Sequence, residues 1–161
     1  MLKRIIKNQT DEIAYKINEE EISYSELYEK AIYYGDLLKK QGNGPIIIYG
    51  HKSINTFLSI FACISSKRAY VPIDTCTPIE RIKKIITKSN ATLILTDENI
   101  KIENIENLSI AELEKYNENE IKENKNETAY IIFTSGSTGE PKGVPISYDN
   151  LFNFINWINL S

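Results

Sequence analysis

The sequence has few of the residues that mark secreted, metal-binding or membrane-spanning proteins. It contains only two cysteines, Cys63 and Cys76, and one histidine, His51, and it has no C-x-x-C pair. This composition excludes a disulfide framework and a cysteine–histidine metal site of the usual spacings, so we expect no metal-ligating cluster. No apolar run approaches the roughly 20 residues that a membrane helix needs, and no hydrophobic segment follows the charged residues at the start of the chain. We therefore expect no membrane insertion, no signal peptide and a reduced, cytoplasmic setting.

The chain also lacks an excess of positive charge. Its formal net charge is −3, and its lysines and arginines are scattered rather than arranged in a stripe. This distribution argues against a surface for nucleic acids or anionic membranes. The hydrophobic fraction of 42% and the charged fraction of 25% are typical of a soluble globular protein, and 161 residues suffice for one core.

Helical spacing and helix-start signals occur several times along the sequence. Ser23 followed by Glu26 forms a capping box, and the helix that it begins has a plausible end at Gly42. Thr77 and Glu80 form a second capping box, with Pro78 at the first helical position. Two further helices are predicted from apolar residues at helical spacing, in residues 54–61 and 151–158.

Short apolar runs lie between these helices and read as strands. They comprise residues 46–49, 69–73, 91–95 and 130–133, with residues 13–17 as a further candidate. Strands that alternate with helices predict an α/β fold with a mostly parallel sheet and helices on both faces. In residues 98–128, Ser109 and Glu112 indicate one short capped helix, and we expect the remainder to be a solvated surface connection.

The strand at 130–133 leads into the part of the sequence with the clearest chemistry. Six small residues follow it, and then comes the run Glu140-Pro141-Lys142-Gly143. A loop with glycines exposes backbone N–H groups that can surround an anion, hydroxyl groups add donors, and the lysine adds a positive charge. We therefore predict a loop that binds the polyphosphate of a nucleotide. It is made of Thr134, Ser135, Gly136, Ser137, Thr138, Gly139 and Lys142.

Other nucleotide and catalytic loops do not fit this run. A Walker A loop needs a Gly-Lys-Ser/Thr ending, which is missing, and neither G-x-G-x-x-G nor G-x-S-x-G occurs. A glycine–serine hinge remains the structural alternative. A hinge requires neither the preceding buried strand nor the Pro-Lys-Gly ending.

The loop resembles the phosphate-loop signature of the adenylate-forming superfamily. Residues 69–74, Ala-Tyr-Val-Pro-Ile-Asp, with Pro78 and Arg81, resemble a motif of its amino-acid-activating branch. Within that branch, residues 48–51 and 148–157 are similar to the D-alanine–D-alanyl carrier protein ligases. The resemblance implies that residues 1–161 are the N-terminal portion of a large adenylation domain. The rest of that domain, a C-terminal lid and the catalytic residues are then expected beyond Ser161.

The same resemblance implies a reaction and its participants. The cofactors are ATP and Mg²⁺, the substrate is D-alanine, and the acceptor is a phosphopantetheinylated D-alanyl carrier protein that serves teichoic acid D-alanylation. An adenylation domain of a nonribosomal peptide synthetase is the first alternative, and a non-catalytic nucleotide-binding fragment is the second. We expect the isolated segment to be inactive.

Two positions depart from the family pattern, and a few other residues carry weaker expectations. Lys67 occupies a place where the family usually has glycine, so a left-handed backbone there would be mildly strained. Pro145 cannot donate an N–H, so it should lie at an edge or an unpaired position. We expect His51 to have a structural hydrogen-bonding role, Asp74 to form an ion pair with Arg81 or a cap, and two residues to serve packing, Cys63 and Trp157.

Overall fold

A parallel sheet organises the chain in the computed structural model, which describes residues 2–6, 10–135 and 140–158. Within these residues the main sheet has the strand order β6-β5-β3-β4-β7-β8. All neighbouring strands run parallel except β7 and β8, which form an antiparallel pair. The strands are β3 (Ile46–Tyr49), β4 (Tyr70–Ile73), β5 (Leu93–Leu95), β6 (Glu106–Leu108), β7 (Thr128–Ser135) and β8 (Pro141–Ser147).

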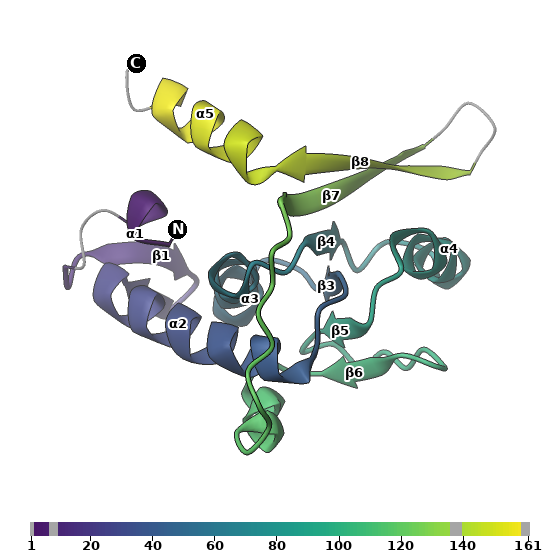
Figure 1. The fold of residues 1–161 in the computed structure, drawn as a ribbon, viewed down its shortest axis with the longest axis horizontal. Helices are drawn as coiled ribbons and strands as arrows, with labels where there is room; N and C mark the ends of the chain where they lie inside the picture. The colour runs from purple at the N-terminus through teal and green to yellow at the C-terminus, as the bar shows by residue number, and fades with distance from the viewer. Residues whose placement is uncertain (1, 7–9, 136–139, 159–161) are drawn as a thin grey trace.

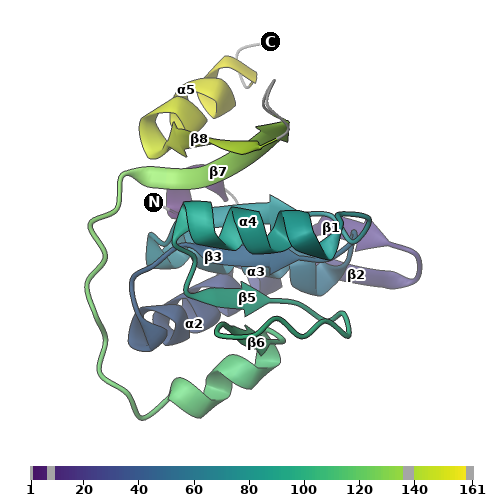
Figure 2. The ribbon, with the colours of Figure 1, turned by 90° about the vertical axis from the view of Figure 1, so that its right-hand side faces the viewer.

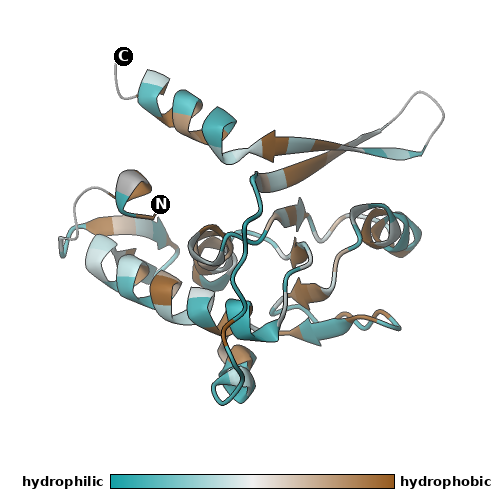
Figure 3. Ribbon diagram, in the orientation of Figure 1, coloured by the Kyte–Doolittle hydropathy of each residue, from teal (hydrophilic) through white to brown (hydrophobic). Residues whose placement is uncertain are grey.

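Helices cover both faces of this sheet, as predicted. Helices α2 (Tyr24–Gln41) and α3 (Ile54–Ser66) lie on one face, and α4 (Ile79–Ser89) lies on the other (Figure 1). Because strand side chains alternate between faces, Ile46 and Ile48 join the core under α2 and α3, whereas Ile47 joins the core under α4. The hydropathy colouring places the most apolar strands, β3 to β5, in the middle of this sandwich (Figure 3). The predicted α/β fold is therefore confirmed.

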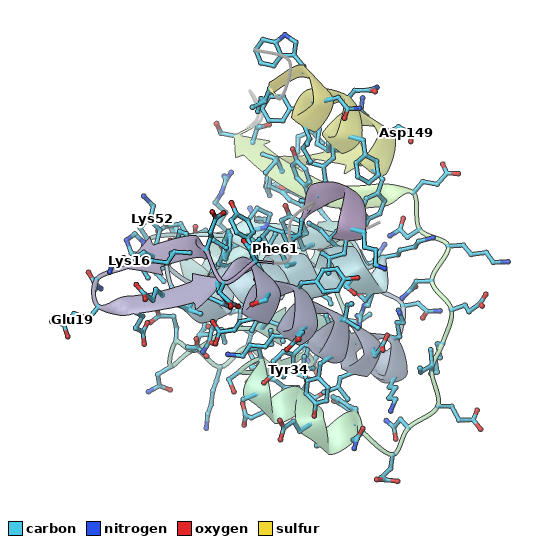
Figure 4. All side chains as sticks on the ribbon, turned by 90° about the vertical axis from the view of Figure 1, so that its left-hand side faces the viewer. Lys16, Glu19, Tyr34, Lys52, Phe61 and Asp149 are labelled. Atoms are coloured by element: carbon cyan, nitrogen blue, oxygen red, sulfur yellow. The ribbon has the colours of Figure 1, made fainter. Side chains whose placement is uncertain are left out.

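The N-terminal residues add a small separate sheet. Helix α1 (Leu2–Ile5) precedes β1 (Ile13–Ile17), which was predicted, and β2 (Glu20–Ser23), which was not; the two strands pair antiparallel. Tyr15 of β1 stacks on Phe57 of α3 with ring centroids 4.4 Å apart, and Phe57 in turn contacts Phe61. Figure 4 shows Lys16 and Glu19 at the tip of this hairpin, at the far end of the molecule from Asp149.

The predicted helix ends are partly confirmed. Ser23 caps α2 with both halves of the capping box present, and Gly42 is its C-cap, with the N–H of Gly42 donating to the carbonyl of Leu38. The capping box predicted at Thr77 and Glu80 is wrong, because α4 has no side-chain cap and its N-cap is Pro78. Pro78 has an extended backbone with ψ of 141°, and its carbonyl accepts the N–H of Arg81 at 2.9 Å. The first turn is thus closed by the backbone.

Residues 98–128 are more structured than the predicted surface connection. They contain β6, which runs parallel to β5 at the edge of the sheet and buries Leu108. They also contain the 3₁₀ helix η1 (Ala111–Tyr116), where a short capped helix was expected. The Ser109 N–H donates to the Glu112 carboxylate at 2.7 Å, which is one half of a capping box. Glu106 accepts a hydrogen bond from the Tyr116 hydroxyl and so joins η1 to β6.

A buried arginine joins the elements at the amino ends of the central strands. Arg68 is 0% exposed. Its guanidinium donates to the carbonyl of Gly44 at 2.8 Å, the carbonyl of Leu38 at 3.1 Å and the hydroxyl of Thr92 at 2.8 Å, and also to the side-chain oxygen of Gln41. Burial lowers the pKa of Arg68 to about 10, so the side chain remains charged at neutral pH. Dipolar acceptors, rather than a carboxylate, therefore offset the cost of burying this charge.

We predict that Arg68→Met destabilises the chain by about 2–4 kcal/mol, because it leaves several buried acceptors without a donor. Urea unfolding followed by circular dichroism measures the change. The neighbouring Lys67→Gly is the control, because Lys67 is left-handed with φ of 57°. Glycine relieves that strain, so this variant should be unchanged or up to about 1 kcal/mol more stable. An Arg68→Met variant as stable as the unaltered chain would contradict the assigned role.

Candidate functional site

The predicted phosphate loop belongs to a β-hairpin. Strand β7 continues past the predicted end at Phe133 to Ser135, because β8 pairs with it as far as Ser135 opposite Pro141. Thr134 and Ser135 therefore lie in β7, and Lys142 lies in β8 opposite Thr134, so these three residues are not in a loop as predicted. Of the other predicted site residues, Gly136, Ser137, Thr138 and Gly139 lie outside the described residues. The described part thus brings Thr134, Ser135 and Lys142 together at one end of the hairpin.

Gly143 shows that the Pro-Lys-Gly ending has a packing role. A Cβ atom built on Gly143 would lie 2.9 Å from Cζ of Phe133 and 3.1 Å from Cγ2 of Ile131. These distances are too short for ordinary contacts, so the ring of Phe133 lies over a position that only glycine leaves open. The glycine thereby allows β8 to pair closely with β7 next to Lys142.

Two lysines of α4 reach the exit of the loop, and the sequence pattern did not reveal them. Lys84 Nζ lies 2.7 Å from Oε1 of Glu140, and Lys88 Nζ lies 3.1 Å from Oε2 of the same carboxylate. Lys88 also donates to the carbonyl of Pro141 at 3.1 Å. Hydrogen bonds from Lys84 and then Lys88 hold the pKa of Glu140 below its usual value. The spacing of the two lysines, one helical turn apart, was the only available signal.

A groove of about 420 Å³ lies between α4 and the hairpin. Most of its lining is apolar, and Lys88 brings a charge to it from α4. Lys142 is exposed, and no carboxylate among the described residues pairs with it. Its charge is therefore available to an anion, which is the property the predicted site requires. The residues that line the groove are Lys88, Ser89, Ile131, Phe133, Lys142, Gly143 and Pro145.

The carboxyl ends of β3 and β4 carry a second group of polar residues. His51 Nδ1 lies 3.6 Å from Oδ2 of Asp74, and both side chains are exposed. Asp74 also accepts the N–H of Cys76 at 2.9 Å, and this hydrogen bond is the main reason that the pKa of Asp74 lies below its usual value. The expected helix cap by Asp74 is not formed, because its hydrogen bond to Cys76 closes a local turn and α4 has no side-chain cap. The suggested Asp74–Arg81 pair is not formed either, and the carboxylate lies beside the imidazole of His51 instead.

Several further expectations can be checked directly. Lys67 has the left-handed backbone that its position suggested, and Pro145 lies on the edge strand β8. Cys63 is buried, and desolvation raises the pKa of its thiol to about 12. Trp157 packs against Phe154 with ring centroids 6.2 Å apart, yet it is 66% exposed. Among the described residues there is no cluster of three metal-ligating side chains, and none of their helices is long and apolar enough to cross a membrane.

Curated relatives match almost the whole chain. The D-alanine–D-alanyl carrier protein ligase of Bacillus licheniformis is 34% identical over 98% of this chain and 34% of the relative. The ligase of the same name from Staphylococcus epidermidis is 33% identical over 98% of this chain and 33% of the relative. The chain therefore spans about a third of the length of the curated relatives that it matches.

Solved structures agree on the fold. O-succinylbenzoate coenzyme A synthetase from Bacillus subtilis, solved in complex with AMP, superposes with a TM-score of 0.79 at 19% identity, covering 99% of this chain and 45% of the other. At that identity the likeness establishes the fold alone. The sequence itself matches the family described as AMP-binding enzyme over residues 2–161. With its parallel sheet, its hairpin and this match over nearly its full length, the chain belongs to the AMP-binding enzyme family.

Proposed function

We propose that residues 1–161 form the N-terminal portion of the large adenylation domain of an enzyme that activates D-alanine with ATP. The activated D-alanine then passes to the phosphopantetheine thiol of a carrier protein in the cytoplasm, for D-alanylation of teichoic acids. The observation that carries this proposal is the exposed charge of Lys142, which has no ion-pair partner among the described residues. Lys142 lies beside Thr134 and Ser135 at the carboxyl end of β7, which runs parallel to its neighbour β4. Ligands of such sheets bind beyond the carboxyl ends of the strands. The names of the relatives point to the substrate and the acceptor.

The proposed chemistry has two displacements. In the first, a carboxylate oxygen of D-alanine attacks the α-phosphorus of ATP, and pyrophosphate leaves with the electrons of the broken P–O bond. In the second, the carrier thiolate attacks the adenylate carbonyl, and AMP leaves. Residues 134–139 would bind the β- and γ-phosphates, and Lys142 would offset their charge, so this segment acts by positioning and electrostatics.

Mg²⁺ would accompany the nucleotide. It prefers oxygen ligands, keeps several waters and is commonly bound through substrate phosphates. Of the described residues at the hairpin end, the hydroxyls of Thr134 and Ser135 fit such a role. Glu140 fits less well, because each of its carboxylate oxygens already accepts from a lysine. When bound, the ion would reduce the negative charge of the phosphates.

A chimera tests the proposed function. Residues 1–161 replace the matching third of the Bacillus licheniformis ligase, and D-alanine-dependent exchange of labelled pyrophosphate into ATP is measured. We expect exchange by the chimera and a loss of about 10- to 100-fold in kcat/KM for ATP with Lys142→Ala, because a charge-assisted contact to phosphate is removed. Lys101→Ala, at an exposed lysine on the loop after β5, should retain activity. A folded chimera without exchange would refute the proposal, provided that the parent ligase is active.

The identity of the amino acid is a separate prediction. We expect D-alanine to support faster exchange than L-alanine in a full-length protein that carries this segment with its own continuation. The basis is the similarity to the named relatives. Both enantiomers are compared in the same exchange assay. A clear preference for L-alanine or another L-amino acid would instead favour a peptide-synthetase adenylation domain.

The isolated 161-residue chain should bind Mg-ATP weakly and form no adenylate. Contacts to phosphates largely replace contacts to water, so they add little net affinity without contacts to the base and ribose. We expect a dissociation constant weaker than about 100 μM in calorimetric titration, for the same physical reason. The same titration of the Lys142→Ala variant with Mg-ATP measures any binding that does not involve Lys142. A sub-micromolar dissociation constant, or adenylate made by the chain alone, would show that this view of the loop is wrong.

A further inference from the structure

The exit limb of the hairpin is attached to α4 by a group of three side chains. Lys84 and Lys88 lie four residues apart, so they project from the same face of the helix. Each lysine takes one oxygen of the Glu140 carboxylate, at 2.7 and 3.1 Å, although Glu140 follows them by more than 50 residues in the sequence. We call Lys84, Lys88 and Glu140 the α4 brace.

Lys88 makes a second contact that the other lysine does not. Its Nζ donates to the carbonyl of Pro141 at 3.1 Å. Proline has no N–H, so this carbonyl is the only backbone hydrogen-bonding group that Pro141 has. Because β8 is the edge strand, no further strand is available to bond its outer side. Lys88 therefore contacts both the side chain and the backbone of the limb that leads to Lys142.

The helix that carries the brace is itself firmly held. Ile82 and Ile85 of α4 are buried in the core cluster that also contains Ile47, Val71 and Ile94 of the central strands. The brace thus connects the rigid sheet to the start of β8. This connection is useful because β7 joins β4 through only one registered pair, Tyr70 opposite Tyr130.

We propose that Lys88 is a positioning residue, which through Glu140 and the Pro141 carbonyl fixes the limb that carries Lys142 before a nucleotide binds. The inference rests on the proposed function and adds α4 to the machinery of that site. The brace is about half exposed, and exposed ion pairs contribute little to global stability. A contact of this kind can still matter for a reaction, because misplacing a binding group by a small distance lowers the rate strongly. The effect of Lys88 should therefore appear in catalysis and local order rather than in the melting temperature.

The helix supplies its own matched control. Lys83 lies on α4 next to Lys84 and pairs with Glu80 of the same helix at 2.9 Å. It has a similar exposure and the same kind of partner, but its contact does not leave the helix. Lys83→Gln therefore removes a charge and an ion pair from α4 without touching the hairpin.

The first measurement uses the chimera and its pyrophosphate exchange. Lys88→Gln should lower kcat/KM for ATP by about 5- to 20-fold, mainly through KM, as expected when a preorganised contact is lost. Lys88→Arg keeps the charge and the donors and should remain within about 2-fold, as should Lys83→Gln. Because Lys88 and Glu140 share one ion pair, the double variant Lys88→Gln with Glu140→Gln should lose less than the product of the two single losses. Equal losses in Lys88→Gln and Lys83→Gln would overturn the proposal.

The second measurement needs no activity. Amide hydrogen exchange at Lys142 and Gly143 in the 161-residue chain should be about 5-fold faster in Lys88→Gln and unchanged in Lys83→Gln, because local opening becomes easier. Unchanged exchange in both variants would overturn the brace, even if the chimera is fully active. A chimera without pyrophosphate exchange would overturn the proposed function instead, and hydrogen exchange would then decide the brace alone.

Discussion

The structure depends on one buried charge, the guanidinium of Arg68. It donates to the last turn of α2 through Leu38, to the turn before β3 through Gly44, and to the approach to β5 through Thr92. Arg68 itself lies between α3 and β4, so four connections meet at one side chain. A buried guanidinium cannot lose its proton at neutral pH, and every donor that loses its acceptor becomes costly. The amino ends of the central strands are thereby fixed to one another and to both helices of that face.

The hydrogen bonds of Arg68 occupy polar groups at the amino ends of the central strands. Polar side chains that a ligand could reach lie at the opposite, carboxyl ends. His51 and Asp74 follow β3 and β4 there, and Thr134 and Ser135 end β7. Figure 2 shows β3 and β7 running in the same direction. The two ends differ in their charge chemistry. At the amino ends the guanidinium of Arg68 is desolvated and donates four hydrogen bonds, whereas at the hairpin Lys142 is exposed and has no ion-pair partner among the described residues. An anionic ligand gains little from the first arrangement and much from the second.

The central strands and their helices were predictable, because their side chains are apolar at regular spacing. The edges were not. Strand β8 reads Pro-Lys-Gly-Val-Pro-Ile-Ser, a composition that disfavours a strand, and it forms because an edge tolerates proline and because β7 extends to meet it. Strand β6 is three residues long and mostly polar, so only its burial of Leu108 identifies it. Arg68 follows Lys67 and looks like ordinary surface charge in the sequence. The α4 brace joins residues more than 50 positions apart, which local patterns cannot reveal.

The hairpin that carries the candidate site forms the edge of the main sheet opposite β6. In Figure 1 the hairpin lies beyond β4, on the side of the sheet away from α2. The stacked rings of Tyr70 and Tyr130, 5.4 Å apart, attach its base, and the α4 brace attaches its exit limb. The helix that follows, α5 (Tyr148–Ile158), buries Tyr148 and Phe152 in the core and exposes Phe154 by 57%. The orientation of the candidate site therefore depends on the contacts that hold the β7–β8 hairpin. Ile131 and Phe133 of β7 pack against the core under α4. Two further contacts hold the hairpin on opposite strands, the aromatic stack near the start of β7 and the α4 brace near the start of β8. The α4 brace contacts Glu140 and Pro141, the two residues that precede Lys142. The lysines that hold this limb and the lysine offered to a ligand are therefore neighbours in the fold.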